Sequence, residues 1–170
     1  PDAALPPALP GEGGFAASGT CVQTGPGGRA WIAAGNAPRA RVFLTNDYGA
    51  TWTAVDAPVV AGDAAGLTSI SMADQRTGTA FGGALAVTDR RTDNVVRTTD
   101  GGRTWTLLPH VSFAGALYGG THGAGDDDAL LAAGPGGLAA SVDGGRTWST
   151  IDARAWWAVG SLSATASWVA

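Results

Sequence analysis

The sequence predicts an all-β protein, a partial β-propeller made of three four-stranded blades and the start of a fourth. An eight-residue string occurs three times, each time with a hydroxyl residue, Asp, Gly, Thr and Trp at the same offsets. Its aspartates, Asp47, Asp100 and Asp143, lie 53 and then 43 positions apart. That spacing is about one propeller blade per repeat, with an insertion in the longer interval.

Each copy of the string is predicted to form a tight turn between two strands. The Asp carboxylate can accept hydrogen bonds from backbone amides of the turn, and Gly supplies the positive φ that such a turn needs. Thr and Trp then begin the next strand, because both favour a half-buried pleated surface. The turn residues are Thr45, Asp47, Gly49, Thr51 and Trp52, then Thr98, Asp100, Gly102, Thr104 and Trp105, then Ser141, Asp143, Gly145, Thr147 and Trp148.

The segments between the turns divide the chain into units. Residues 1–14 are rich in Pro and Gly and are predicted to be a leader or an inter-blade loop. The predicted units are blade 1 at 15–60, blade 2 at 61–110, blade 3 at 111–153 and an incomplete blade at 154–170. Strands are expected at 15–22, 30–35, 41–45, 51–55, 68–72, 79–83, 94–98, 105–108, 129–134, 138–141 and 156–160, with one more within 161–170.

The repeated string Ser/Thr-x-Asp-x-Gly-x-Thr-Trp resembles the Asp-box, or bacterial neuraminidase repeat, of several β-propellers. The second unit, with an apolar strand, Asp74, Gly78 and a short strand ending in Gly, resembles the repeat of photosystem II stability and assembly factors and their bacterial relatives. The resemblance implies a chain about twice as long, a structural role for the turns, and a scaffold that holds a partner protein outside the cytoplasm.

Composition excludes several classes of function. Acidic residues outnumber basic ones by 14 to 10, so a general nucleic-acid binder is not expected. No run of about 18 apolar residues exists, so no membrane span is expected. Cys21 is the single cysteine, which excludes an internal disulfide and a Cys-based metal cluster. The chain opens without a Met or a signal-peptide pattern, so we expect a piece of a longer exported protein.

The three aspartates of the turns suggest acid–base chemistry, but their spacing argues against it. Glycoside hydrolysis needs two carboxyl groups about 5–10 Å apart, whereas these lie on different blades. A sialidase-like glycoside hydrolase also needs an arginine cluster and a Tyr–Glu pair. The single glutamate, Glu12, lies in the leader, and only two tyrosines occur. A sialidase-like fragment and a carbohydrate-binding propeller therefore remain as alternatives to the scaffold, and no catalytic residue, enzyme activity or cofactor is expected.

The remaining polar groups give weaker signals. Arg90 and Arg91 are predicted to contact a partner, although the neighbouring Asp89 and Asp93 offer a simpler pairing. The Asp126–Asp128 run lacks the ligand spacing of a calcium loop and is predicted to be a solvated turn. His110 and His122 have no sequence partners, so both are interpreted as ordinary surface or loop residues, and no metal site is expected.

Overall fold

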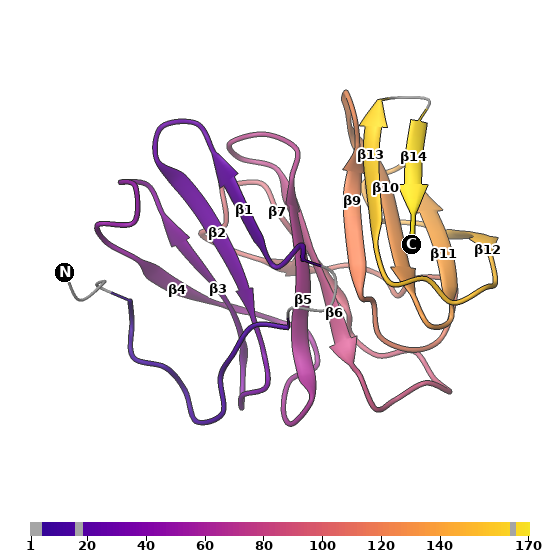
Figure 1. Cartoon of the computed structure of the whole chain (residues 1–170), viewed down its shortest axis with the longest axis horizontal. Coiled ribbons are helices and arrows are strands. Elements are labelled where there is room, and N and C mark those ends of the chain that lie inside the picture. The colour runs from indigo at the N-terminus through magenta and orange to yellow at the C-terminus, as the bar shows by residue number, and fades with distance from the viewer. Residues whose placement is uncertain (1–4, 16–18, 164–165) are drawn as a thin grey trace.

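The protein is an open series of β-sheets. The computed structural model describes residues 5–15, 19–163 and 166–170, and within them every regular element is a strand. Three four-stranded antiparallel sheets and one two-stranded sheet follow one another across the molecule, from the N-terminal sheet at the left of Figure 1 to the C-terminal one at the right. The predicted partial β-propeller is confirmed. No helix in the described residues is long and apolar enough to cross a membrane.

Each sheet contains strands that are consecutive in the chain. Blade 1 has β1 (Val22–Gly25), β2 (Arg29–Ala34), β3 (Ala40–Thr45) and β4 (Thr53–Ala57). Blade 2 has β5 (Ala65–Met72), β6 (Gly78–Ala84), β7 (Val95–Thr98) and β8 (Thr106–Leu107). Blade 3 has β9 (Gly119–Gly123), β10 (Asp126–Gly134), β11 (Gly137–Ser141) and β12 (Ser149–Asp152). The last sheet has β13 (Val159–Ser163) and β14 (Ala166–Val169).

The order of strands gives the molecule two distinct faces. Because consecutive strands run antiparallel, the first-to-second and third-to-fourth turns of every blade lie at the same edge. We call this side the turn face; it carries the β1–β2 and β9–β10 turns at the top of Figure 1. The chain enters the first strand of each blade from the opposite side, the entry face. The first strand of blade 3, β9, packs against β5 and β13, which are the first strands of the two neighbouring sheets.

The hydrophobic core lies between the blades, and blade 2 is buried on both sides. Ala80 and Val96 pack toward blade 1, whereas their neighbours Phe81 and Val95 pack toward blade 3. This alternation follows from the two-residue period of a strand. It explains why β5 and β6 are almost uniformly apolar or small, since both of their faces are covered.

Several elements differ from the sequence-based expectation. The inner strand of blade 1 was predicted at 15–22, but β1 begins only at Val22; positions 16–18 lie outside the described residues. The strand β9 was not predicted, because its Gly-rich sequence has no strand-like pattern. Its glycines allow close packing: a Cβ on Gly120 would lie only 2.4 Å from the Phe81 ring. The acidic residues Asp126–Asp128, predicted to be a turn, begin β10.

The described part of the leader packs on the outer side of blade 1. The backbones of Gly13 and Gly35 exchange hydrogen bonds of 2.9 and 3.1 Å. The side chain of Glu12 forms an ion pair with Arg41 of β3, and both side chains are almost completely buried. A second bond joins Arg41 Nη2 to the Pro7 carbonyl at 3.0 Å. A segment that looks unstructured in sequence is thereby attached to the sheet.

Candidate functional site

The three repeated turns share one hydrogen-bond network. In each, the first hydroxyl donates to the Asp carboxylate at 2.7–2.8 Å. The same hydroxyl accepts the backbone N–H of the glycine four residues later, which all three copies share. The later Thr donates both its N–H and its hydroxyl to the same carboxylate. The residues are Thr45, Asp47, Gly49 and Thr51; Thr98, Asp100, Gly102 and Thr104; Ser141, Asp143, Gly145 and Thr147.

These bonds hold each Asp in its ionised form. The Thr51 and Thr147 hydroxyls, with the backbone amides beside them, hold the pKa of Asp47 and Asp143 at about 2. Burial would raise the pKa of Asp100, but its hydrogen bonds outweigh this and the pKa is again about 2. A glycosidase general acid needs a raised pKa. Every carboxyl group in the described residues with a resolved shift is lowered instead.

Each turn is also attached to the first-to-second turn of its own blade or to the start of the strand that follows it. The residue after the Asp donates its backbone N–H to a carbonyl there: Tyr48 to Gly28 at 2.9 Å, Gly101 to Arg76 at 2.8 Å, and Gly144 to Asp128 at 2.9 Å. Gly28, Arg76 and Asp128 are therefore structurally equivalent.

The tryptophans of the turns occupy different surroundings. Trp105 is buried in the core between blades 1 and 2, whereas Trp52 and Trp148 are half-buried. The Trp31 indole, from β2, also enters this core and donates its N–H to the Gly101 carbonyl at 2.9 Å. Sequence reasoning missed Trp31, because 70 positions separate it from the turn that it contacts.

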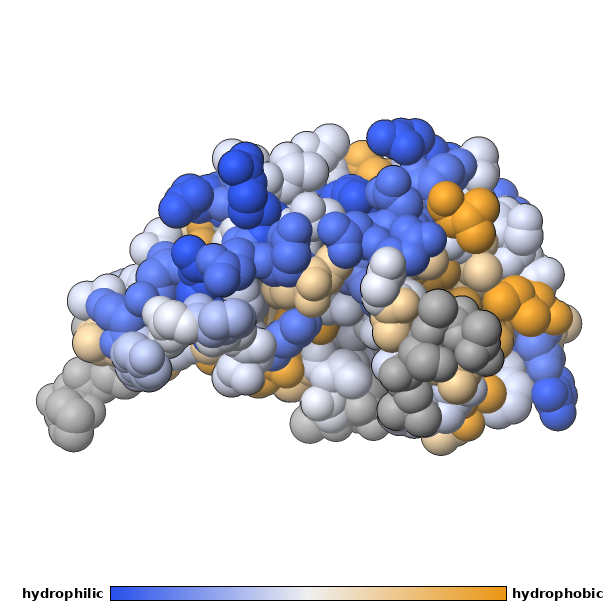
Figure 2. Space-filling view, turned by 90° about the horizontal axis from the view of Figure 1, so that it is seen from above, coloured by the Kyte–Doolittle hydropathy of each residue, from blue (hydrophilic) through white to orange (hydrophobic). Residues whose placement is uncertain are grey.

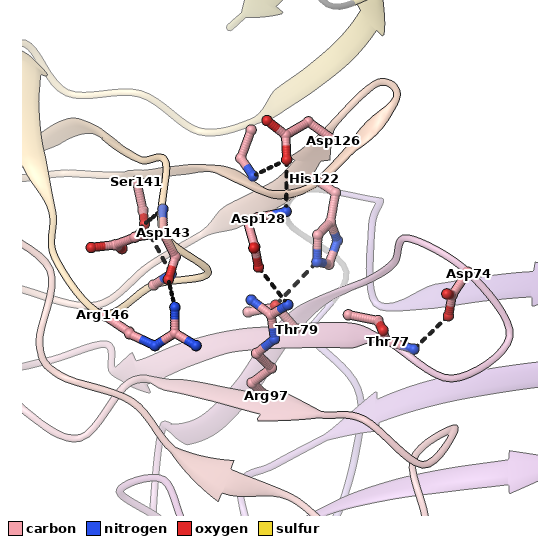
Figure 3. A network of polar contacts seen from close by, with 12 residues as sticks. Asp74, Thr77, Thr79, Arg97, His122, Asp126, Asp128, Ser141, Asp143 and Arg146 are labelled. Atoms are coloured by element: carbon pink, nitrogen blue, oxygen red, sulfur yellow. Dashed lines mark hydrogen bonds and ion pairs between the residues drawn. The ribbon is translucent and has the colours of Figure 1, made fainter.

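A polar network joins blades 2 and 3 beside the third turn (Figure 3). His122 of β9 is buried, with its Nδ1 3.1 Å from Ser71 Oγ and its Nε2 3.3 Å from Thr79 Oγ1. Arg97 of β7 forms an ion pair with Asp128 of β10 at 2.9 Å. The interpretation of His122 as a surface or loop residue is therefore wrong, since the missed strand β9 carries it into the interface.

Burial of His122 predicts a specific dependence of stability on pH. Desolvation, reinforced by the positive charge of Arg97, lowers the pKa of His122 to about 4, against the opposing effect of Asp74 and Asp128. The unfolded chain, with a histidine pKa near 6.5, then binds the proton more readily than the folded protein. Stability is expected to fall by about 3 kcal/mol as the pH decreases from 6.5 to 4.

Urea unfolding at several pH values measures this effect. The variant His122→Gln keeps hydrogen-bonding capacity without a titrating ring and is expected to lose most of the slope between pH 6.5 and 4. An equal slope in both proteins would show that His122 is not the responsible group.

On the entry face, two aromatic rings stack at the start of neighbouring inner strands. Tyr118 precedes β9 and Trp157 precedes β13, and their ring centroids lie 4.8 Å apart with an interplanar angle of 17°. Trp157 is 59% exposed. The backbones of both residues are fixed, since Tyr118 N–H donates to Ala133 O and Trp157 N–H to Ala170 O. An exposed flat ring held in this way can stack against a planar or apolar ligand surface.

Arg90 and Arg91, which were predicted from the sequence to contact a partner, also lie on the entry face, in the β6–β7 connection. Arg90 lies 3.7 Å from the Asp89 carboxylate, and Arg91 donates to the Ser112 carbonyl at 2.6 Å. His110 lies 2.9 Å from Asp93. Contact of Arg90 and Arg91 with a partner stays a prediction. In the described residues, no group of three or more His, Cys, Asp or Glu side chains could hold a metal ion.

Comparison with known proteins gives the fold class. No protein-family model matches the chain, and no curated protein matches its sequence. The solved structure of the Niastella koreensis GH74 enzyme superposes with a TM-score of 0.55 at 17% identity, covering 88% of this chain. The chain spans 21% of that protein. This likeness supports the β-propeller fold.

The expectation that the chain is not an enzyme is overturned by this comparison. A protein that shares the fold of 88% of this chain is itself an enzyme of the GH74 class of glycoside hydrolases. That expectation rested mainly on the three turns and on the missing arginine–tyrosine site of a sialidase. A propeller has a second face, and chemistry on that face does not depend on either feature.

Proposed function

We propose that this chain is a glycan-binding segment of a larger β-propeller enzyme of the glycoside hydrolase type. The observation that carries the proposal is the stacked Tyr118–Trp157 pair on the entry face. The apolar face of a sugar ring packs well against an exposed indole, and binding sites commonly combine such rigid aromatic anchors with a few polar groups. The glycoside hydrolase found with the same fold supports the choice of a sugar as ligand.

The segment contributes binding rather than the acid–base pair. The described carboxylate nearest in sequence to the aromatic pair, Asp152, pairs with Arg154 at 2.6 Å, which holds the pKa of Asp152 at about 2. A carboxylate of that kind stays ionised and cannot donate a proton to a leaving group near neutral pH. The same proposal places the protein outside the cytoplasm, where polysaccharides too large to enter a cell are found.

Binding to a panel of neutral polysaccharides tests the role of Trp157. Affinity electrophoresis of the wild-type protein is expected to show retardation by at least one of them. Trp157→Ala is expected to weaken that binding tenfold or more, which corresponds to about 1.4 kcal/mol. Trp168, which is 46% exposed and packs over Gly160, gives a matched control, and Trp168→Ala should bind as the wild type does. Equal binding by Trp157→Ala and the wild type would contradict the proposal.

A further inference from the structure

A groove on the turn face, between blades 1 and 2, has the chemistry of an anion site. It has a volume of about 310 Å³. Figure 2 looks onto this side of the molecule and shows hydrophilic side chains gathered in a band across it. The groove is lined by Arg29, Leu44, Asn46, Gln75, Arg76, Asp100, Gly101 and Arg103.

Its three arginines are held in place by neutral oxygens. Arg29 donates to the side-chain oxygens of Asn46, at 3.2 Å, and of Gln75. Arg76 Nε donates to a backbone carbonyl at 3.4 Å, and Arg103 Nη1 to the carbonyl of Asp100 at 3.0 Å. Each guanidinium has five N–H donors, so most of them stay available. Among the described residues, none of the three arginines forms an ion pair with a carboxylate.

The carboxylates near the groove are occupied by other donors. Both oxygens of Asp100 accept hydrogen bonds inside its own turn, from Thr98 and Thr104. Asp74 accepts the backbone N–H groups of Arg76 and Thr77 at 2.6 Å. Both carboxylates stay ionised, but the three arginines outnumber them, so the positive charge of the groove is only partly balanced.

The corresponding place between blades 2 and 3 shows what a neutralised groove looks like. Asp128 there is equivalent to Arg76, because each accepts the backbone N–H of the first glycine in its turn. Its carboxylate pairs with Arg97 at 2.9 Å. Between blades 1 and 2 the equivalent position carries a positive charge instead of a negative one. The two junctions can therefore be compared directly. The arginine between blades 2 and 3 has a carboxylate partner, whereas the three arginines of the groove between blades 1 and 2 form no ion pair among the described residues.

An exposed aromatic ring lies in a second pocket on the turn face. Tyr48 is 87% exposed and has a φ of 59°, where the other two turns have Gly101 and Gly144. A left-handed conformation costs a non-glycine residue roughly 1–2 kcal/mol, and the ring of Tyr48 lies over the backbone of Gly28. Tyr48 lines a second pocket, which shares Arg29 with the groove. An aromatic ring near a guanidinium group suits a sugar that carries a negative charge.

We propose that the groove of Arg29, Arg76 and Arg103 binds the carboxylate groups of an acidic glycan. Planar carboxylates accept paired hydrogen bonds from guanidinium groups, and Tyr48 lines the pocket that shares Arg29 with the groove. The choice of a glycan rests on the proposed function, whereas the preference for an anion rests on the groove alone. The site is on the opposite face from the Tyr118–Trp157 pair.

Titration calorimetry with oligogalacturonate, a carboxylate-bearing glycan, tests this site. Binding is expected, and it should weaken as salt rises because the charges are exposed. Arg103→Gln is expected to reduce affinity tenfold or more. Arg146→Gln is the matched control, since Arg146 makes the same bond to the carbonyl of its own turn aspartate at 2.9 Å but lies outside the groove. Arg76→Asp copies the charge found at Asp128 and should abolish binding while leaving the thermal midpoint nearly unchanged.

Three results would overturn the proposal. The first is an equal effect of Arg103→Gln and Arg146→Gln, which would indicate nonspecific attraction. The second is equal affinity for polyglutamate, which would assign the groove to an acidic peptide. The third is equal affinity for inorganic phosphate, which would leave a simple ion site. Trp157→Ala should bind oligogalacturonate normally, so failure of neutral-glycan binding and failure of this site give different patterns.

Discussion

Replacing Trp31 by Ala is expected to lower the free energy of unfolding by about 3–5 kcal/mol, the usual cost of deleting a large buried aromatic side chain. Trp31 is only 2% exposed and packs in the core between blades 1 and 2, among residues that include Ile70, Met72 and Trp105. Its N–H bond to the carbonyl of Gly101 also connects blade 1 to the second turn. Trp31→Ala would therefore leave a cavity in this core and would also remove the hydrogen bond between the two blades.

Urea denaturation of the wild type and two variants separates these contributions. Trp31→Phe retains an aromatic ring but loses the N–H donor, so it should cost less than Trp31→Ala, with about 1 kcal/mol of the loss due to the hydrogen bond. If Trp31→Ala lowered stability by less than 1 kcal/mol, the interface between blades 1 and 2 would not be an essential part of the core. Because the alanine variant risks global unfolding at ordinary domain stabilities, the phenylalanine variant keeps the test informative.

The sequence predicts the turns better than the contacts between blades. Asp47, Asp100 and Asp143 can be recognised because each network lies within a few residues, so the local string contains all its partners. The contact of Trp31 with Gly101 spans 70 positions and depends on how two blades pack, which no local pattern records. The strand β9 was missed for a related reason: its Gly120 lies against the ring of Phe81, which belongs to another sheet.

The residues of the two candidate sites likewise come together only through the packing of different repeats. The Tyr118–Trp157 stack and the groove of Arg29, Arg76 and Arg103 each combine residues from different repeats. Their residue types are visible in the sequence, but their proximity is not. The charge difference between the two junctions becomes visible only once Arg76 and Asp128 are known to be equivalent, and that equivalence comes from backbone hydrogen bonds.

The ion pair between the leader and blade 1 should be almost as important for stability as Trp31. Arg41 Nε donates to Glu12 Oε1 at 2.7 Å, and the exposed fractions of the two side chains are 9% and 3%. Arg41→Ala would leave the Glu12 carboxylate buried with only the backbone N–H of Leu9 as a donor at 2.9 Å. Breaking a buried pair in this way costs about 3–5 kcal/mol. Urea denaturation at neutral pH measures the loss.

Two comparisons make this prediction specific to burial. Arg39 forms an ion pair with Asp56 at 2.8 Å, but both side chains are more than half exposed, so Arg39→Ala should cost less than 1 kcal/mol. The hydrogen bond from Arg41 lowers the pKa of Glu12 in the wild type, so the pair stabilises the fold above the ordinary glutamate pKa and loses this effect as the pH falls below it. In Arg41→Ala, burial without the cation should raise that pKa, and a protonated Glu12 is neutral. The difference between wild type and Arg41→Ala should therefore shrink from pH 7 to pH 4, whereas a constant difference would assign the cost to lost packing of the arginine side chain.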